Sequence, residues 1–253
     1  MIRKNLVLLL TVFLACNGLI TCGIDEYYYL PQVSEGGIRI NLNTEAVIEL
    51  EPITPPGTGE YYYAVSYTIF YRIYTSNFLT SSSTDIAQIS PILVSDYNFF
   101  SQYTNPTNTT SVTSLNTFRS RNYYELEFEG TDKVSILPKS GGTFRIRFPT
   151  SLWGEPTATL STLNDGQEYK LLRSSQLISP QPRDDLLFRN TPELRSYENI
   201  NDNINADVAG RTGEMQYSYV SMYIVASGVN PNNFTQIFSK PTHVSLFKLP
   251  DTN

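Results

Sequence analysis

The longest alternating pattern in the chain runs through residues 61–74, YYYAVSYTIFYRIY, where aromatic and β-branched residues dominate. Such residues favour strands, in which successive side chains point to opposite faces. One alternate set is continuously apolar and is predicted to face the core: Val65, Tyr67, Ile69, Tyr71 and Ile73. The other set is mixed and is expected on the opposite side: Ala64, Ser66, Thr68, Phe70 and Arg72.

Shorter β-rich runs lie on both sides of this segment. Residues 38–42 (IRINL) and 46–50 (AVIEL) are predicted to be the first two strands. The Pro and Gly content of residues 52–60 indicates a turn. Near the other end, QYSYVSMYIVA from Gln216 and HVSLFKL from His243 predict two more strands.

The stretch after the long strand differs in kind. Residues 85–97 are predicted to contain a short helical piece, with Ser83 or Thr84 as its cap and Pro91 restricting it to short turns. Residues 105–116, NPTNTTSVTSLN, have the composition of an exposed polar loop.

A strand meander is predicted next. Its strands are YYELEFE from Tyr123, KVSIL from Lys133 and TFRIRF from Thr143, separated by the turns GTD and PKSGG. The following segment is the least regular, and short strands are expected only at Ala158 and Glu168.

Five segments occur in an order that resembles strands B, C, F and G of a fibronectin type III domain: AVIELEP, SYTIFYRIY, SMYIVASGVN, SKPT and HVSLFKL. In that family strand B ends in W-x-P, strand C reads Y-x-V-x-Y-R, strand F contains V-x-A, and S-x-P precedes strand G. The matching positions here are Leu50, Glu51 and Pro52, then Tyr67, Ile69, Tyr71 and Arg72, then Ile224 and Ala226, then Ser239 and Pro241. Leu50 stands where the family has its core Trp.

The resemblance implies a mainly β fold, an elaborated fibronectin type III or immunoglobulin-like sandwich. Residues 38–250 would form one domain. Residues 76–215 would be a long insertion between strands C and F, containing the meander and the helical piece.

The first 21 residues have the layout of a secretory signal. MIRKN is positively charged, and the apolar run 6–15 is about half the roughly 20 residues that a membrane span requires. Leu19 to Cys22 reads LITC and resembles the box that precedes the acylated cysteine of bacterial lipoproteins. The alternative is Cys16 after FLA, where Phe replaces the favoured Leu and the spacer is almost absent.

Cys22 is therefore the predicted lipid attachment residue, and residues 22–37 the acylated cysteine and a tether. The chain with its CGIDEYYYLP segment is similar to spirochaete lipoproteins. The resemblance implies export and attachment to a bacterial membrane through acyl chains, with the outer membrane or cell surface favoured over the cytoplasmic membrane.

Charge makes nucleic acid an unexpected partner. Without residues 1–21 the chain has 16 basic and 24 acidic residues, a formal net charge of −8. The basic side chains are scattered, and the close pairs Arg119/Arg121 and Arg145/Arg147 have the spacing of a solvated strand face.

Residues typical of catalysis are sparse. His243 is the one histidine and is interpreted as an ordinary strand residue, and no cofactor, metal or catalytic residue is assigned. Asn203, Asn205, Asp207 and Glu214 have part of a calcium-loop spacing, but an Asn-rich surface loop is the preferred interpretation. Glu125, Glu127 and Glu129 alternate along one strand, and an exposed face is expected there.

The sequence favours a non-enzymatic module that binds a protein or glycan ligand at the cell envelope. Two alternatives remain open. One is a structural or assembly lipoprotein of the periplasm, and the other is a carbohydrate-active enzyme, because two suitably spaced carboxylates can come from any strands.

Overall fold

The structure, a computed structural model, describes residues 30, 32–42, 45–50, 63–76, 90–104, 114–128, 135–136, 142–148, 171–177, 188, 206–209, 217–229, 234 and 236–249. The predicted signal peptide, Cys22 and the expected strand at Ala158 lie outside these residues. The elements, in chain order, are η1 (Glu35–Gly37), β1 (Ile38–Leu42), β2 (Glu45–Leu50), β3 (Tyr63–Ser76), α3 (Pro91–Thr104), α4 (Leu115–Arg119), β4 (Tyr124–Glu125), β5 (Glu127–Phe128), β6 (Ser135–Ile136), β7 (Gly142–Arg147), β8 (Leu171–Leu172), η2 (Ser175–Leu177), β9 (Val208–Ala209), β10 (Tyr217–Val229), β11 (Gln236–Phe238) and β12 (Thr242–Lys248). Most are strands in antiparallel sheets, which confirms a mainly β fold.

The larger sheet is built around the long pair β3 and β10. These strands run antiparallel from Tyr63 opposite Val229 to Ser76 opposite Tyr217. β11 and β12 pair with β10 on its other side. The short strands β4, β6 and β9 pair with β3. The strands expected over residues 61–74, from Gln216 and from His243 are thus confirmed.

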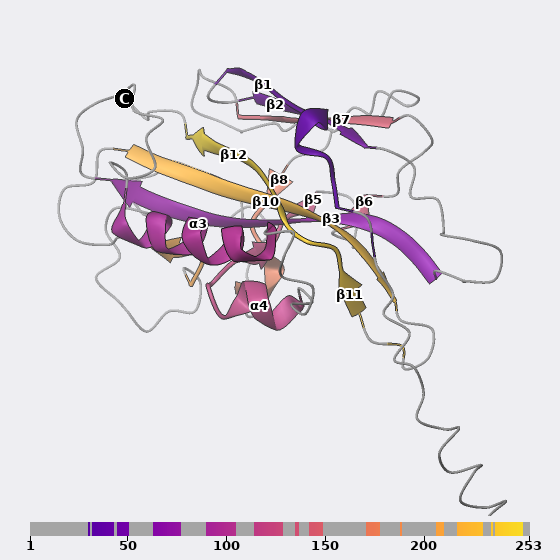
Figure 1. Cartoon of the computed structure of the whole chain (residues 1–253). Coiled ribbons are helices and arrows are strands. Elements are labelled where there is room, and N and C mark those ends of the chain that lie inside the picture. The colour runs from indigo at the N-terminus through magenta and orange to yellow at the C-terminus, as the bar shows by residue number, and fades with distance from the viewer. Residues whose placement is uncertain are drawn as a thin grey trace, which may run out of the picture.

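The smaller sheet has the strand order β1-β2-β7 and packs on one face of the larger sheet (Figure 1). An apolar core fills the space between them. From the smaller sheet it takes Ala46, Ile48, Leu50, Phe144 and Ile146, and from the larger one Tyr67, Ile69, Tyr71, Ile73, Val220, Met222, Ile224, Ala226, Val244 and Phe247. The prediction that the alternate set from Tyr67 to Ile73 faces a core is confirmed.

The opposite face of β3 is also buried. Helices α3 and α4 cover it (Figure 1), and Phe70 stacks on Phe118 of α4 with ring centroids 3.8 Å apart. Ser66, Thr68 and Arg72 are buried on this face too. The alternate set that includes Phe70 and Arg72 is mixed in polarity because the second core is itself partly polar. A mixed set of residues therefore does not indicate a solvent-exposed face here.

Helix α3 overlaps the second half of the predicted helical piece and extends beyond it, whereas the predicted caps Ser83 and Thr84 lie outside the described residues. It begins at Pro91 and continues to Thr104, and Ser90 caps it, since the Ile92 N–H donates to Ser90 Oγ at 3.2 Å. Proline fits the first helical position because the amide hydrogen that it lacks has no intrahelical partner there. Pro91 therefore starts the helix rather than limiting it.

The predicted meander is wrong in its pairing. Among the described residues, β4 and β6 pair with β3, β5 pairs with β8, and β7 pairs with β2. The strand expected from Tyr123 is interrupted at Leu126, whose N–H donates to Ile69 O at 2.8 Å. β4, β6 and β7 thus add to the two larger sheets, whereas β5 and β8 form a small sheet of their own. Ile146 shares one core with Ile69 and Ile224.

The end of the predicted tether docks against the fold. Leu30 and Val33 are buried in the core between the sheets. Gln32 Nε2 donates to Pro241 O at 3.0 Å, and Thr242 Oγ1 donates to Val33 O at 2.7 Å. The part of the chain that the structure describes contains no helix long and apolar enough to cross a membrane.

Candidate functional site

A charged cluster lies buried between the larger sheet and helix α3. Arg72 of β3 donates from Nη1 to Asp96 Oδ2 of α3 at 2.5 Å. Arg121, in the turn after α4, places Nη1 3.5 Å from Asp96 Oδ1. Asp96 is almost completely buried, so two guanidinium groups compensate the cost of removing its charge from water.

A chain of hydroxyl groups extends from this carboxylate into the sheet. The Tyr74 hydroxyl donates to Asp96 Oδ2 at 2.7 Å and lies 2.9 Å from the hydroxyl of Tyr123, which lies 3.1 Å from Ser221 Oγ. Burial raises the pKa of Tyr74 and Tyr123 well above the ordinary value. Both phenols are therefore neutral hydrogen-bonding groups at physiological pH.

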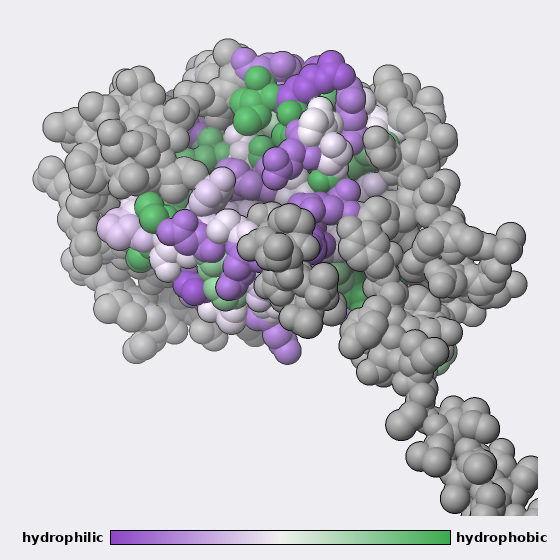
Figure 2. Space-filling model, viewed as in Figure 1, coloured by the Kyte–Doolittle hydropathy of each residue, from purple (hydrophilic) through white to green (hydrophobic). Residues whose placement is uncertain are grey.

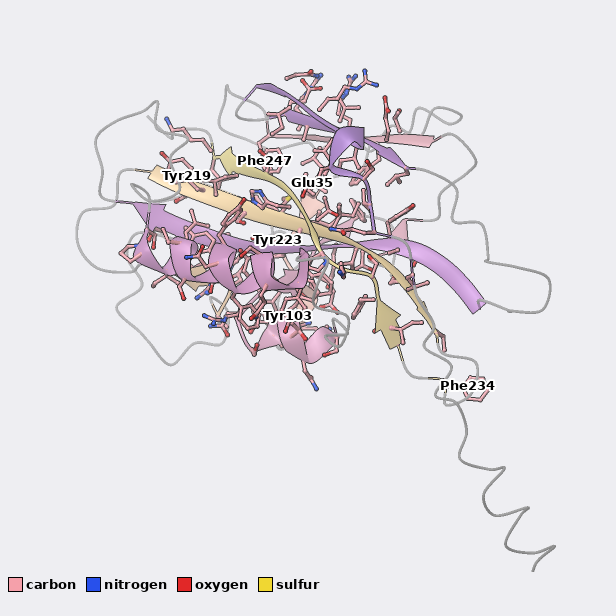
Figure 3. The ribbon with its side chains drawn as sticks, in the orientation of Figure 1. Glu35, Tyr103, Tyr219, Tyr223, Phe234 and Phe247 are labelled. Atoms are coloured by element: carbon pink, nitrogen blue, oxygen red, sulfur yellow. The ribbon has the colours of Figure 1, made fainter. Side chains whose placement is uncertain are left out.

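His243 lies at the other end of this chain, in β12 as predicted. Its Nε2 is 3.5 Å from Ser221 Oγ, and its ring contacts those of Tyr223 and Tyr97, at centroid distances of 5.0 and 5.5 Å. In Figure 3 Tyr223 lies between α3 and the larger sheet. Burial lowers the pKa of His243 to about 4, so the imidazole is neutral at pH 7.

Serine, histidine and aspartate thus occur along one polar chain, but their arrangement differs from a catalytic triad. A triad needs the carboxylate on the histidine and an accessible serine. Here the groups hydrogen-bonded or ion-paired to Asp96 are Arg72, Arg121 and Tyr74, and Ser221 is completely buried. The geometry suits structural hydrogen bonding between α3 and the sheet.

A second buried ion pair joins Arg173, after β8, to Asp207, before β9. Arg173 Nε donates to Asp207 Oδ2 at 2.8 Å, and its Nη2 contacts Oδ1. Their side chains are 5% and 0% exposed. The Asp207 carbonyl accepts from Ile73 N of β3 at 2.9 Å, and Tyr71 Oη accepts from Ser174 N at the same distance. Burial raises the pKa of Tyr71 well above its usual value.

The surface-loop interpretation is wrong for Asp207, because its carboxylate is buried and neutralised by Arg173. Asn203, Asn205 and Glu214 lie outside the described residues. Among the residues that the structure describes, no three or more His, Cys, Asp or Glu side chains are placed together to hold a metal ion.

The exposed strand face expected for Glu125 and Glu127 is also wrong. Glu125 is 13% exposed and pairs with Arg119, which lies at the end of α4 with its guanidinium 4.2 Å from the centre of the Tyr124 ring. Glu127 belongs to β5, which is in a different sheet from the β4 residue Glu125. Its Oε1 accepts from Ser174 Oγ at 3.5 Å. Glu129 lies outside the described residues. The last residues of the loop predicted over 105–116 fall in α4, whose first turn Ser114 caps, and residues 105–113 lie outside the described residues.

The two arginine pairs have different environments. Arg119 is the last residue of helix α4 and Arg121 lies in the turn after it, where its guanidinium stacks on the ring of Phe99 at 4.2 Å. Arg145 and Arg147 do lie on one face of β7, where both guanidinium groups contact Glu45 Oε1, at 3.0 and 3.3 Å. Predicted strand spacing was thus correct only for the second pair.

Sequence reasoning missed both buried ion pairs. A signal for the first was present, because Arg72 interrupts an apolar strand, while Asp96 shares a helix face with Leu93 and Phe100. A charge on a buried face requires a partner. Arg173 and Asp207 belong to short irregular segments, where the sequence carries no periodicity that reports burial.

Comparison with protein-family models, with curated proteins and with solved structures found no match to this chain.

Proposed function

We propose that this chain is an exported lipoprotein, acylated at Cys22, whose β-sandwich binds a protein or glycan ligand at the cell envelope and has no catalytic activity. The signal-like residues 1–21 and the LITC segment support the anchor. The docking of Leu30 and Val33 supports a tether that joins the fold within a few residues of that cysteine.

A fibronectin type III or immunoglobulin-like sandwich forms part of the proposal. In such folds strands C, F and G share a sheet and strand B belongs to the other. The segments that resemble C, F and G are β3, β10 and β12, which are neighbours in the larger sheet, and the segment that resembles B is β2 of the smaller sheet. Ser239 also bridges to strand β10, since the Ala226 N–H donates to Ser239 Oγ at 2.9 Å.

One observation carries the binding role: the buried charges of the described residues are paired internally. Asp96 and Asp207 are both neutralised by arginine and lie beneath the surface. Groups held in this way stabilise a scaffold, whereas catalysis needs an acid, base or nucleophile that a substrate can approach. This favours a scaffold that presents a surface to a partner.

Substitution of the two cysteines tests the anchor. In cells expressing the full chain, C22S should abolish acylation and release the protein from the membrane fraction, because the acyl chains supply the membrane affinity. The matched variant C16S should leave both unchanged. The measurement is the mass of the N-terminal peptide, together with membrane fractionation. Loss of acylation in C16S instead would assign the anchor to the other cysteine.

Binding is tested with the purified, acylated protein on arrays of glycans and matrix proteins, followed by titration of each positive ligand. Saturable binding is expected. The binding role would be contradicted if no ligand saturates, and turnover of a glycan would favour the enzymatic alternative. Protease treatment of intact cells distinguishes a surface module, which is cleaved, from a periplasmic assembly protein, which is protected.

A further inference from the structure

Phe234, between β10 and β11, is the most exposed large apolar side chain of the described residues. It is 77% exposed, against 55% for Ile40 and less for Ile92 and Tyr97. In Figure 3 its ring lies at one extremity of the described structure, beyond β11 and away from the packed layers. The remaining surface visible in Figure 2 is mixed, with hydrophobic residues in small areas rather than one broad patch.

The backbone at Phe234 is also unusual. Its φ angle is 57°, in the left-handed region that a bulky side chain rarely adopts. The other described non-glycine residue with positive φ is Asn122, a residue type that tolerates this conformation. The exposure of the ring and its unfavourable backbone angle together point to a contact outside the chain.

The exposed ring is close along the chain to the docking point of the tether. Seven residue steps separate Phe234 from Pro241, whose carbonyl accepts from Gln32 Nε2. Those steps span at most about 25 Å. Eight residue steps separate Cys22 from Leu30, which is buried in the core, and these span at most about 29 Å. These spans allow the acylated cysteine and Phe234 to reach one and the same membrane surface.

The segment around Phe234 carries no charge that would oppose contact with a bilayer. No Asp, Glu, Lys or Arg occurs between the end of β10 at Val229 and Ser239, although the chain has 24 acidic residues. A charged group brought to an apolar boundary loses hydration, and an acidic one is repelled by anionic lipids. Neither penalty applies to this segment, whose apolar tip is flanked by uncharged polar residues.

We propose that Phe234 is a second membrane contact, which inserts its ring at the headgroup boundary of the bilayer that holds the acyl chains of Cys22. The inference rests on the proposed lipid anchor and extends it. Aromatic side chains favour this interfacial zone. Acyl chains on a tether fix the distance of the module from the membrane, whereas an inserted ring also fixes its orientation.

Lipid quenching of a tryptophan tests this contact. The full acylated chain, with W153F removing the native tryptophan, carries F234W and is reconstituted into phosphatidylcholine vesicles with or without brominated acyl chains. The emission of F234W should fall by roughly half or more in brominated vesicles, because bromine quenches only at short range in the bilayer. The matched control I40W, an exposed position in the other sheet, should keep its emission.

A reporter beside Phe234 covers the case in which F234W does not fold. Q236W places the tryptophan at an exposed position of β11 and leaves Phe234 intact. It should be quenched, and addition of F234N, which suits the backbone angle, should reduce that quenching toward the I40W level.

Equal quenching of Q236W with and without F234N would overturn the membrane contact. Equal quenching of F234W and I40W by the brominated lipid would overturn it as well. A protein that lacks acylation and fails to join the vesicles would instead refute the anchor, so the two failures are distinguishable.

Discussion

Two buried ion pairs lie close to β3, and they are built differently. Arg72–Asp96 joins the strand itself to α3, and the carboxylate is shared with Arg121 and Tyr74. Arg173–Asp207 joins a residue after β8 to a residue before β9, and both carboxylate oxygens of Asp207 contact the one guanidinium. In the first pair one carboxylate holds two guanidinium groups, whereas in the second one carboxylate makes two contacts with a single guanidinium. The consequence of losing a partner should differ accordingly.

The largest effect is expected at the Arg173–Asp207 pair. D207N removes the carboxylate charge that both contacts of the buried Arg173 guanidinium reach, and should lower the free energy of unfolding by about 3 to 5 kcal/mol. Urea-induced unfolding of the purified protein measures the change. The double variant R173M/D207L removes both charges and should be less destabilised than D207N. A double variant as unstable as the single one would show that packing, rather than unpaired charge, dominates at this site.

A smaller effect is expected at the shared carboxylate. D96N should destabilise by about 2 kcal/mol, since the amide still accepts from Tyr74 and Arg121 is partly exposed to water. The same urea titration applies, with N98A as the control on the exposed side of α3, where a change within about 0.5 kcal/mol is expected. If D96N proves costlier than D207N, the two arginines left beside the amide outweigh the hydrogen bond that the amide keeps.

The pH dependence of stability distinguishes the two regions, because His243 lies at the end of the polar chain that begins at Asp96. Its folded pKa of about 4 lies below the ordinary 6.5, so the unfolded chain binds the proton more readily. The contribution of His243 to the free energy of unfolding is fully present above the unfolded pKa, and it is lost as the pH falls from 6.5 toward 4. Between pH 7 and pH 5 the loss should be at most about 2 kcal/mol.

The variant H243Q isolates that contribution. The pH dependence of unfolding between pH 7 and pH 5 should be weaker in H243Q than in the parent, while D207N should retain the parental slope over this interval. An unchanged slope in H243Q would mean that the histidine is protonated without cost in the folded protein.

Local patterns in the sequence predicted single strands well. The apolar set from Tyr67 to Ile73 reports burial because alternation is a property of the strand alone. Capping could also have been read correctly: Ser90 before Pro91 has the residues of a helix start.

Pairing between distant segments could not be read in this way. Short strands such as β4 and β6 look like parts of a meander, yet they add to the edge of β3. Nothing local distinguishes the two outcomes, since the hydrogen bonds are between backbone groups. The pairing of Arg173 with Asp207 could not be predicted either, because both residues lie in segments without a periodic pattern. A buried partner for Arg72, by contrast, was implied by its position in an apolar strand.

The pairing of β3 with β10 has a consequence for the order of folding. Its partners are separated by 141 residues at Ser76 opposite Tyr217 and by 166 at Tyr63 opposite Val229. Contacts between positions so far apart form slowly, because a long loop must close before any of them is gained. A chain that emerges N-terminus first exposes the apolar faces of β3 long before β10 is free to cover them. The strand at the centre of the fold is therefore among the first to appear and among the last to be completed.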